Sequence, residues 1–517
     1  MTESQSAPRM NILVLLVSAL LSGSLAHGAQ GPDSHRSEAR TKNFERQIEG
    51  EGRSLGIEST AGDIVIERGE GDQVSIWVEL EYWSADEDWM EQVGREFDVE
   101  ISESSNEIRI RPFEISERKE KGWLKRLWQR HEISFDLEIR VQVPGGTAVE
   151  IDNRYGDVSV VGVAGAVDVF NSSGAVEVQG ADGGATIENS YGDVVVSDLE
   201  GDLDLTANSG EVRVSAVNGD AEIANRYGEV EVTKLSGGLK LETSSCGIEV
   251  KDVGGSGIVR GSYADVGITG VAGELDVELS SGNLVLVGTQ GKVTAESSYG
   301  EVTVERIGGG LELRCSSCEV QGRYIEGQVR VDNSYGAVVL SDVGGGAEVS
   351  NSSGGVTLER VRGDVDISSS YEAVRVREVG GGLRIVSTSA AVDARQIGGA
   401  AEISTSYAGV VLEGAGGPVD IRNKSGRVEV GGLTGAALAA AHRVETSYGD
   451  LVFSWPLQAS SMSFTLESSY GKILTDFPAI VEDKGSRKTA RGQVGSDRPS
   501  ASVSLSARSG TVHLKQQ

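Results

Sequence analysis

The histidines, which most often supply general bases and zinc ligands, are few and scattered. They are His27, His35, His131, His442 and His513. No spacing among them matches a catalytic triad or a zinc site. Aspartate and glutamate are plentiful, but pairs of carboxylates alone do not identify a glycosidase. The sequence therefore predicts no catalytic residue, no metal ligand and no cofactor.

The cysteines are the next candidates for chemistry. Cys315 and Cys318 stand in the segment Cys-Ser-Ser-Cys and could form a disulfide in an oxidising compartment. A redox function is the weaker interpretation, because no βαβ pattern surrounds the pair. The third cysteine, Cys246, is distant from both in the sequence.

A basic segment with two tryptophans lies between Glu117 and His131. It contains Trp123, Lys125, Arg126 and Trp128, and its apolar residues would share one face of a helix. One interpretation is a contact site for anionic lipid or an acidic partner. The other is a helix that covers an open end of the fold.

The net charge of −31 over 517 residues argues against nucleic-acid binding, which requires a basic surface. Such a charge is typical of a protein that stays in solution outside the cytoplasm. The calcium-binding nonapeptide of some β-solenoids, which begins Gly-Gly-x-Gly-x-Asp, is not repeated here.

The elements that must carry these residues are repeats of 18 residues. Glycine recurs at every eighteenth position from Gly165 to Gly435, and tyrosine recurs at twice that interval from Tyr155 to Tyr407. Serine takes the tyrosine place in the intervening repeats, beginning with Ser173. A fixed period of this kind indicates a repeat architecture.

Each repeat alternates apolar and other residues, as strands do. Val158, Val176 and Val194 occupy one place in successive repeats, so stacking would align them in a column of β-branched side chains. The sequence therefore predicts an all-β protein, a parallel β-solenoid of about sixteen regular 18-residue coils with β caps at both ends. The glycine at each repeat is expected where the backbone turns tightly or takes a positive φ.

Two polar columns accompany the apolar ones. Asparagine stands two residues before many of the tyrosine or serine places, as at Asn153 and Asn171, and is expected to point inward and bond to neighbouring coils. The tyrosines are interpreted as packing residues, each ring lying over the gap left by a serine. A row of ligand-binding tyrosines is the alternative.

The ends of the chain differ from its middle. Residues 1–29 resemble an export signal with a short apolar core, with Met10 as an alternative start, and 30–43 resemble a polar linker. Residues 44–146 are expected to form a β region and cap, 147–435 the regular solenoid, and 436–517 irregular coils and a second cap. Within the last segment, 482–500 is expected to be a mobile loop. No segment after the signal is apolar enough to span a bilayer.

The repeats resemble a bacterial family of exported putative adhesins that is defined by a domain of unknown function. The resemblance rests on Ser190–Val196, which reads Ser-Tyr-Gly-Asp-Val-Val-Val, and on the related segment at Ser447–Val452. It extends to the strand before Pro144 and to Phe477-Pro478 near the end. The resemblance implies a β-solenoid and an adhesin-like role, and it implies no site residues.

Together these observations favour an exported, non-enzymatic β-solenoid that is periplasmic, on the cell surface or extracellular. Its partner would be a cell-envelope component, a glycan or another protein. The alternative is a carbohydrate-active β-helix enzyme, either a polysaccharide lyase or a hydrolase.

Overall fold

The structure is a computed structural model that describes residues 39–84, 87–112, 134–456 and 461–517. The chain forms two compact units. The smaller comprises 1–41, 81–96 and 118–135, and its described part contains helix α1 (Glu87–Glu96). The expectation of β-structure throughout 44–146 is wrong for α1. Glu87 and Asp88 in its first turn and Arg95 in its last turn suit the helix dipole, so the sequence did contain a charge pattern typical of a helix here.

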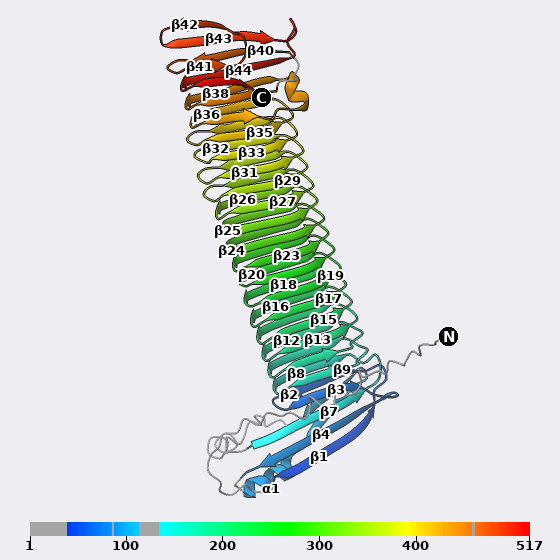
Figure 1. Cartoon of the computed structure of the whole chain (residues 1–517). Coiled ribbons are helices and arrows are strands. Elements are labelled where there is room, and N and C mark those ends of the chain that lie inside the picture. The colour runs from blue at the N-terminus through cyan, green and yellow to red at the C-terminus, as the bar shows by residue number, and fades with distance from the viewer. Residues whose placement is uncertain (1–38, 85–86, 113–133, 457–460) are drawn as a thin grey trace, which may run out of the picture. The chain divides into compact units, whose positions relative to one another are not determined.

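The larger unit contains a parallel β-solenoid, as predicted (Figure 1). Each regular coil carries two strand segments, and each residue pairs with the residue 18 positions further along, as Val167 does with Ala185. Sixteen such coils follow one another from β8 to β37.

The first strands of the coils end at or near the tyrosine or serine place. They are β8 (Val149–Tyr155), β10 (Val167–Ser173), β12 (Ala185–Tyr191), β14 (Leu203–Ser209), β16 (Ala221–Tyr227), β18 (Leu239–Ser245), β20 (Gly257–Tyr263), β22 (Leu275–Ser281), β26 (Val329–Tyr335), β28 (Ala347–Asn351), β30 (Val365–Ser369), β32 (Leu383–Ser387), β34 (Ala401–Thr405) and β36 (Val419–Ser425).

The second strands follow after a corner. They are β9 (Val158–Val161), β11 (Val176–Gln179), β13 (Val194–Leu199), β15 (Val212–Val217), β17 (Val230–Leu235), β19 (Ile248–Val253), β21 (Val266–Val271), β23 (Leu284–Thr289), β27 (Val338–Val343), β29 (Val356–Val361), β31 (Val374–Val379), β33 (Val392–Ile397), β35 (Val410–Ala415) and β37 (Val428–Gly431). In two coils both segments form one strand, β24 (Val293–Ile307) and β25 (Leu311–Ile325).

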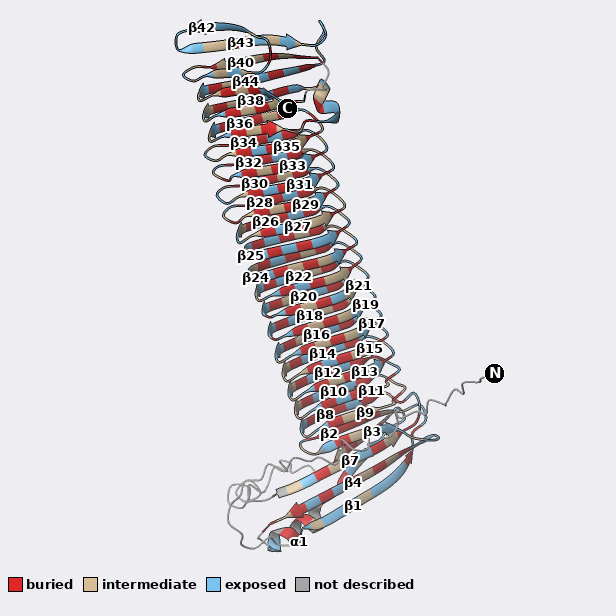
Figure 2. Ribbon diagram, in the orientation of Figure 1, coloured by how far each residue is buried: buried red, intermediate tan, exposed pale blue. Residues whose placement is uncertain are grey.

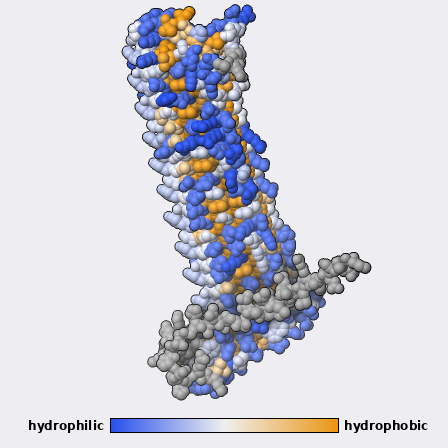
Figure 3. All heavy atoms as spheres, viewed as in Figure 1, coloured by the Kyte–Doolittle hydropathy of each residue, from blue (hydrophilic) through white to orange (hydrophobic). Residues whose placement is uncertain are grey.

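The interior of the solenoid is filled by columns of apolar side chains. Val158, Val176 and Val194 are at most 1% exposed, and buried residues alternate with intermediate or exposed ones along the strands of the regular coils (Figure 2). Burial of each valine contributes roughly 1.5–3 kcal/mol. The face shown in Figure 3 carries blue, pale and orange patches, so hydrophilic and hydrophobic residues both lie on it.

One corner of each coil carries a residue with left-handed backbone conformation. Glycine occupies this place in some coils, as at Gly270 and Gly288, but ten coils place another residue there with φ between 54° and 59°. These residues are Asp198, Ala216, Lys234, Asp252, Arg306, Tyr324, Asp342, Arg360, Glu378 and Gln396. A non-glycine residue in this conformation costs about 1–2 kcal/mol. The pairing with the coils on both sides must offset this cost and hold the corner in place.

The 18-residue glycine column has a different cause. Of its sixteen members from Gly165 to Gly435, only Gly201 and Gly435 have a positive φ, so the expectation of a positive φ at this column is wrong for most coils. Close backbone approach is the reason instead. A Cβ atom on Gly309 would lie 2.5 Å from the carbonyl carbon of Gly291 in the preceding coil.

At the N-terminal side, β2 (Ser54–Ser59) and β3 (Asp63–Arg68) form a coil that pairs with β8 and β9. The remaining strands of this region are β1 (Arg40–Glu49), β4 (Gln73–Trp83), β5 (Val99–Glu103), β6 (Glu107–Pro112) and β7 (Ser134–Val143).

After β37 the chain order and the spatial order differ. The strands β44 and β45 lie between the coil of β38 and β39 and the coil of β40 and β41. The expected mobile loop at 482–500 is wrong, because β42 and β43 form an antiparallel hairpin and β43 pairs with the edge of β40. The elements of this region are the 3-10 helix η1 (Gly435–Ala439), β38 (Ala441–Tyr448), β39 (Leu451–Trp455), β40 (Met462–Ser468), β41 (Ile473–Thr475), β42 (Ile480–Lys484), β43 (Arg487–Val494), β44 (Ala501–Ser509) and β45 (Val512–Gln516).

The left-handed corner can be tested with glycine. Glu378 is exposed and has φ 55°, so Glu378→Gly relieves about 1–2 kcal/mol of backbone strain in the folded state. The greater conformational entropy of glycine in the unfolded chain opposes this gain by about 0.5–1 kcal/mol. We expect a net gain of about 0.5–1 kcal/mol in a denaturant titration. Glu188→Gly, on the exposed face of strand β12, is the matched control and should lose about 0.5–1 kcal/mol. An equal loss in both variants would contradict the strain argument.

The close approach at the glycine column predicts that Gly309→Ala destabilises the solenoid. The added Cβ meets backbone atoms of Gly291 and Lys292, which cannot move without disturbing the ladder. The expected cost is about 1–3 kcal/mol, as for other overpacked sites, measured by thermal or denaturant unfolding. The control is Gly247→Ala, because a Cβ there would meet only the end of Glu229 at 3.9 Å. If the two variants unfold alike, close approach does not explain the column.

Candidate functional site

The tyrosines that recur every second coil are exposed, so the expectation that they are packing residues is wrong. Their exposed fractions run from 52% for Tyr227 to 72% for Tyr470. We call them the tyrosine row: Tyr155, Tyr191, Tyr227, Tyr263, Tyr299, Tyr335, Tyr371, Tyr407, Tyr448 and Tyr470. A line of large, mostly exposed aromatic side chains is the feature of this solenoid that most suits recognition of a partner.

Asparagine fills the inside of the corner in four of the ten tyrosine coils, at Asn153, Asn189, Asn225 and Asn333, and in several serine coils. Asn171 is 1% exposed, as predicted, and its Nδ2 donates to the carbonyl oxygens of Gly156 in the preceding coil and Gly174 in its own, both at 3.3 Å. These amides occupy the inside of the corner. The backbone then turns at Gly174, where φ is 129°, and the residue before the glycine is left on the outside.

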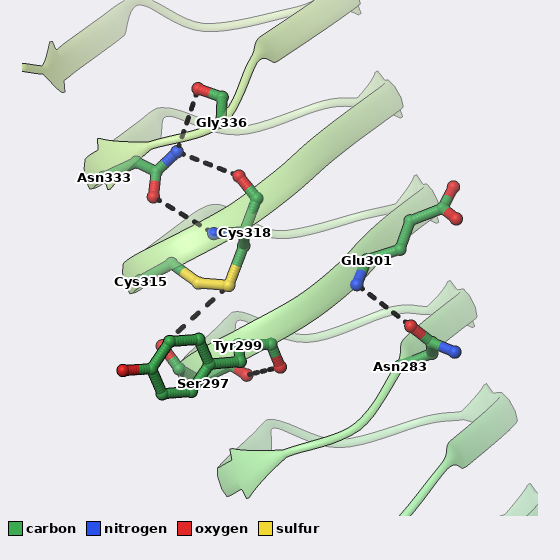
Figure 4. Close-up of a disulfide and its surroundings, with 8 residues drawn as sticks. All are labelled: Asn283, Ser297, Tyr299, Glu301, Cys315, Cys318, Asn333 and Gly336. Atoms are coloured by element: carbon green, nitrogen blue, oxygen red, sulfur yellow. Dashed lines mark hydrogen bonds between the residues drawn. A yellow bond between two sulfur atoms is a disulfide. The ribbon is translucent and has the colours of Figure 1, made fainter. Parts of the chain in front are cut away.

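The aspartate of the Tyr-Gly-Asp motif has a structural role. Oδ1 of Asp157 accepts a hydrogen bond from the backbone N–H of Ala175 in the next coil at 2.8 Å. Asn283 makes the same bond to the N–H of Glu301 at 3.0 Å (Figure 4). The carboxylates of this motif therefore hold one corner to the next.

The row continues through the C-terminal cap although the chain order changes there. Ser425 pairs with Tyr448, and Tyr448 pairs with Ser509. A Cβ on Gly471, the residue after Tyr470, would lie 1.8 Å from the carbonyl oxygen of Gly510, so Tyr470 stands in the coil beyond Ser509. Tyrosine and serine thus alternate to the end of the stack.

A shallow polar groove runs beside the tyrosine row. It has a volume of about 940 Å³, and its lining includes the residue immediately before each tyrosine or serine place. These lining hydroxyls define the serine groove: Ser244, Ser262, Ser280, Ser298, Ser316 and Ser334. Two exposed ion pairs line it as well, Arg260–Glu278 at 3.2 Å and Arg314–Glu296 at 2.7 Å. Row and groove are adjacent because their residues are consecutive in the chain.

Opposite charges alternate along the outer face of some of the first strands. Arg330 lies opposite Glu348 and is 3.2 Å from it, and Arg384 is 3.1 Å from Asp366. Such exposed pairs contribute roughly 0.2–1 kcal/mol each and stabilise the stacking of coils.

The cysteines lie inside the solenoid beneath the row. Cys315 and Cys318 form a disulfide with Cα atoms 5.9 Å apart, and they are 8% and 0% exposed (Figure 4). Cys315 takes an asparagine place, and Asn333 of the next coil donates to the Cys318 carbonyl at 3.0 Å. Cys246 is free and buried, and desolvation raises the pKa of its thiol.

The tryptophan segment with Trp123, Lys125, Arg126 and Trp128 lies outside the described residues. Within the described ranges, no cluster of three or more His, Cys, Asp or Glu side chains could hold a metal ion. None of the described helices is both long and apolar enough to cross a membrane.

Comparison with protein families gives one match, to the family described as Toastrack DUF4097, over residues 53–257 and 272–515. A search of curated proteins finds no match.

Among solved structures, a putative cell adhesion protein from Clostridium sporogenes is 8% identical, with 92% of this chain and 100% of that chain covered and a TM-score of 0.12. A putative adhesin from Bacteroides fragilis is 10% identical, with 56% and 97% covered and a TM-score of 0.20. A putative lipid binding protein from Parabacteroides distasonis is 14% identical, with 66% and 96% covered and a TM-score of 0.14.

The exposure of the row predicts that its rings add little to stability. Tyr299 is 60% exposed, so Tyr299→Ala should change the free energy of unfolding by no more than about 0.5 kcal/mol. A buried ring would cost about 3–5 kcal/mol. Thermal unfolding of the variant measures the difference. Val302→Ala in the same coil is the reference for a buried site. If Tyr299→Ala lowers the free energy of unfolding by a comparable amount, the tyrosines are packing residues after all.

Proposed function

Because the chain belongs to the Toastrack DUF4097 family, we propose that it is an exported, non-enzymatic β-solenoid that binds a partner along its tyrosine row, in the manner of an adhesin. The observation that carries this proposal is the exposure of the row, at 52–72% for each ring. Tyrosine suits such a surface, since it offers a large rigid contact area with a polar end and only two side-chain torsions to fix.

The regularity of the solenoid supports a role in multivalent binding. Neighbouring coils pair in the same register, so each tyrosine stands on the same backbone frame as the next. A partner that contacts one ring in a given way can contact the others in that way too. Linked contacts of this kind raise the overall affinity far above that of a single contact.

Export is supported by the signal-like segment 1–29 and by the cysteine pair. Disulfides form and persist in oxidising compartments outside the cytoplasm, and Cys315 and Cys318 are joined. Their bond lies in the interior beneath Ser317, where it ties one corner of a single coil. This position suits a structural disulfide better than a redox site.

The alternative, a polysaccharide lyase or hydrolase, would need carboxylates free to act in a groove. In the serine groove, Glu278 and Glu296 each accept a hydrogen bond from an arginine, at 3.2 and 2.7 Å. The aspartates of the Tyr-Gly-Asp motif are occupied by backbone N–H groups. These contacts favour binding over catalysis.

Serine can replace the tyrosines without changing the fold, because the chain itself has serine at this place in alternate coils. We expect the variant Tyr263→Ser, Tyr299→Ser, Tyr335→Ser and Tyr371→Ser to lose most of its binding to bacterial cell-envelope fractions in a sedimentation assay. The control is Tyr324→Ser, because Tyr324 is 49% exposed but lies on the left-handed corner, away from the row. Equal binding by all three proteins would contradict a role for the row.

A further inference from the structure

The structure points to one class of occupant for the row and the serine groove, and we propose that it is an extended, uncharged polysaccharide lying along the solenoid. This inference rests on the proposed function and names its ligand. It is carried by the spacing of the rings, the exposure of their faces, the hydroxyl lining beside them and the charge of the surface.

The spacing requires a ligand that repeats. Successive tyrosines of the row lie two coils apart, or about 9.6 Å at the spacing of parallel strands. From Tyr155 to Tyr407 the row spans fourteen coil steps, or about 67 Å. A compact ligand would reach one or two rings, whereas a linear polymer with a regular repeat can meet all of them. Two consecutive sugar rings of an extended β-1,4-linked chain span a length close to one interval of the row.

The alternation with serine leaves the ring faces available. Tyrosines in every coil would stand about 4.8 Å apart, and neighbouring rings would cover each other's faces. Ser281 and Ser317 stand in the coils on either side of Tyr299 and carry no ring, which is consistent with the 60% exposure of Tyr299. At each place between two rings the ladder carries a serine hydroxyl instead.

The aromatic rings and the hydroxyls of this surface both suit a sugar. The face of an aromatic ring carries negative charge density and attracts the weakly positive C–H groups on the face of a pyranose. The hydroxyls of the serine groove can donate to and accept from sugar hydroxyls. The surface thus provides aromatic faces and, in a parallel line, hydroxyls interspersed with charged side chains such as Arg226, Glu242 and Asp332.

The charge of the protein excludes polyanions. The net charge is −31, which repels acidic polysaccharides and nucleic acids. Two of the three arginines that line the serine groove are paired with carboxylates, Arg260 with Glu278 and Arg314 with Glu296; the third is Arg226. Lys424 lies 5.6 Å from the ring centre of Tyr407 and is a cation beside that one ring.

The test measures binding of the full chain to pure oligosaccharides by calorimetry or by affinity electrophoresis. The probes are cellohexaose and chitohexaose, their disaccharides, and polygalacturonate as an acidic polymer. We expect a hexaose to bind at least about tenfold more tightly than its disaccharide, because it engages several rings, and polygalacturonate to bind more weakly than either hexaose.

The variants separate the row from the rest of the surface. Replacement of Tyr263, Tyr299, Tyr335 and Tyr371 by serine should weaken hexaose binding at least about tenfold, while the same four replaced by phenylalanine should retain most of it. Tyr324→Ser should bind as the unaltered protein does. Circular dichroism and thermal unfolding confirm that each variant is folded before its binding is measured.

Several results would overturn the proposal. These are an affinity independent of oligosaccharide length, binding that survives the four serine replacements, or no binding to either hexaose. Binding of the row to phosphatidylcholine vesicles, or a dimer that the serine replacements dissociate, would instead assign it to a lipid surface or to a second copy. If envelope fractions still bind through the row while the glycans do not, the proposed function stands and the polysaccharide is the wrong ligand.

Discussion

The in-register pairing of each residue with its counterpart 18 positions later is the constraint on which the rest of the solenoid depends. It brings chemically equivalent side chains within about 4.8 Å of each other along every column. Each residue must therefore be compatible with the residue at the same place in the neighbouring coils. Valine on valine fills the interior, as at Val158 and Val176, and arginine on glutamate is favoured outside, as at Arg330 and Glu348.

The same constraint explains why two corners of the coil use different backbones. At the glycine column the successive chains come so close that no Cβ fits, as Gly309 shows against Gly291. At the left-handed corner there is room for a side chain but the backbone conformation is unfavourable, and ten coils accept Asp, Arg, Glu or other residues there. A Cβ at the glycine column would meet backbone atoms that the ladder holds in place, whereas an unfavourable φ costs about 1–2 kcal/mol and can be offset by the pairing on both sides.

The sequence was sufficient to predict the period, the register, the apolar columns and the inward asparagines, because each follows from repetition and from strand alternation. It was not sufficient to place Tyr299. Strict alternation counts the tyrosine place as inward, and only the geometry of the corner, where the buried Ser297 fills the inside and the chain turns at Gly300, places the ring outside. The ten residues with left-handed φ were equally hidden, since a column that accepts Asp342, Arg360 and Glu378 shows no compositional signal. The polar segment 482–500 resembled a loop by composition, although pairing with an open strand edge made it a hairpin.

The C-terminal cap shows that position in the stack, more than order in the chain, governs which residue is selected. The last strands, β44 and β45, enter between coils that precede them in sequence. Even so, Ser509 falls between Tyr448 and Tyr470, so the alternation of ring and hydroxyl is kept across a change in connectivity. Packing alone does not require this, because rings that are 53% and 72% exposed contribute little to the core. The parallel ladder then meets the antiparallel strand β43, whose partner β42 carries exposed charges such as Glu482 and Lys484. Charged residues on a strand oppose further pairing, so the stack ends there while the row is carried up to its last parallel coil.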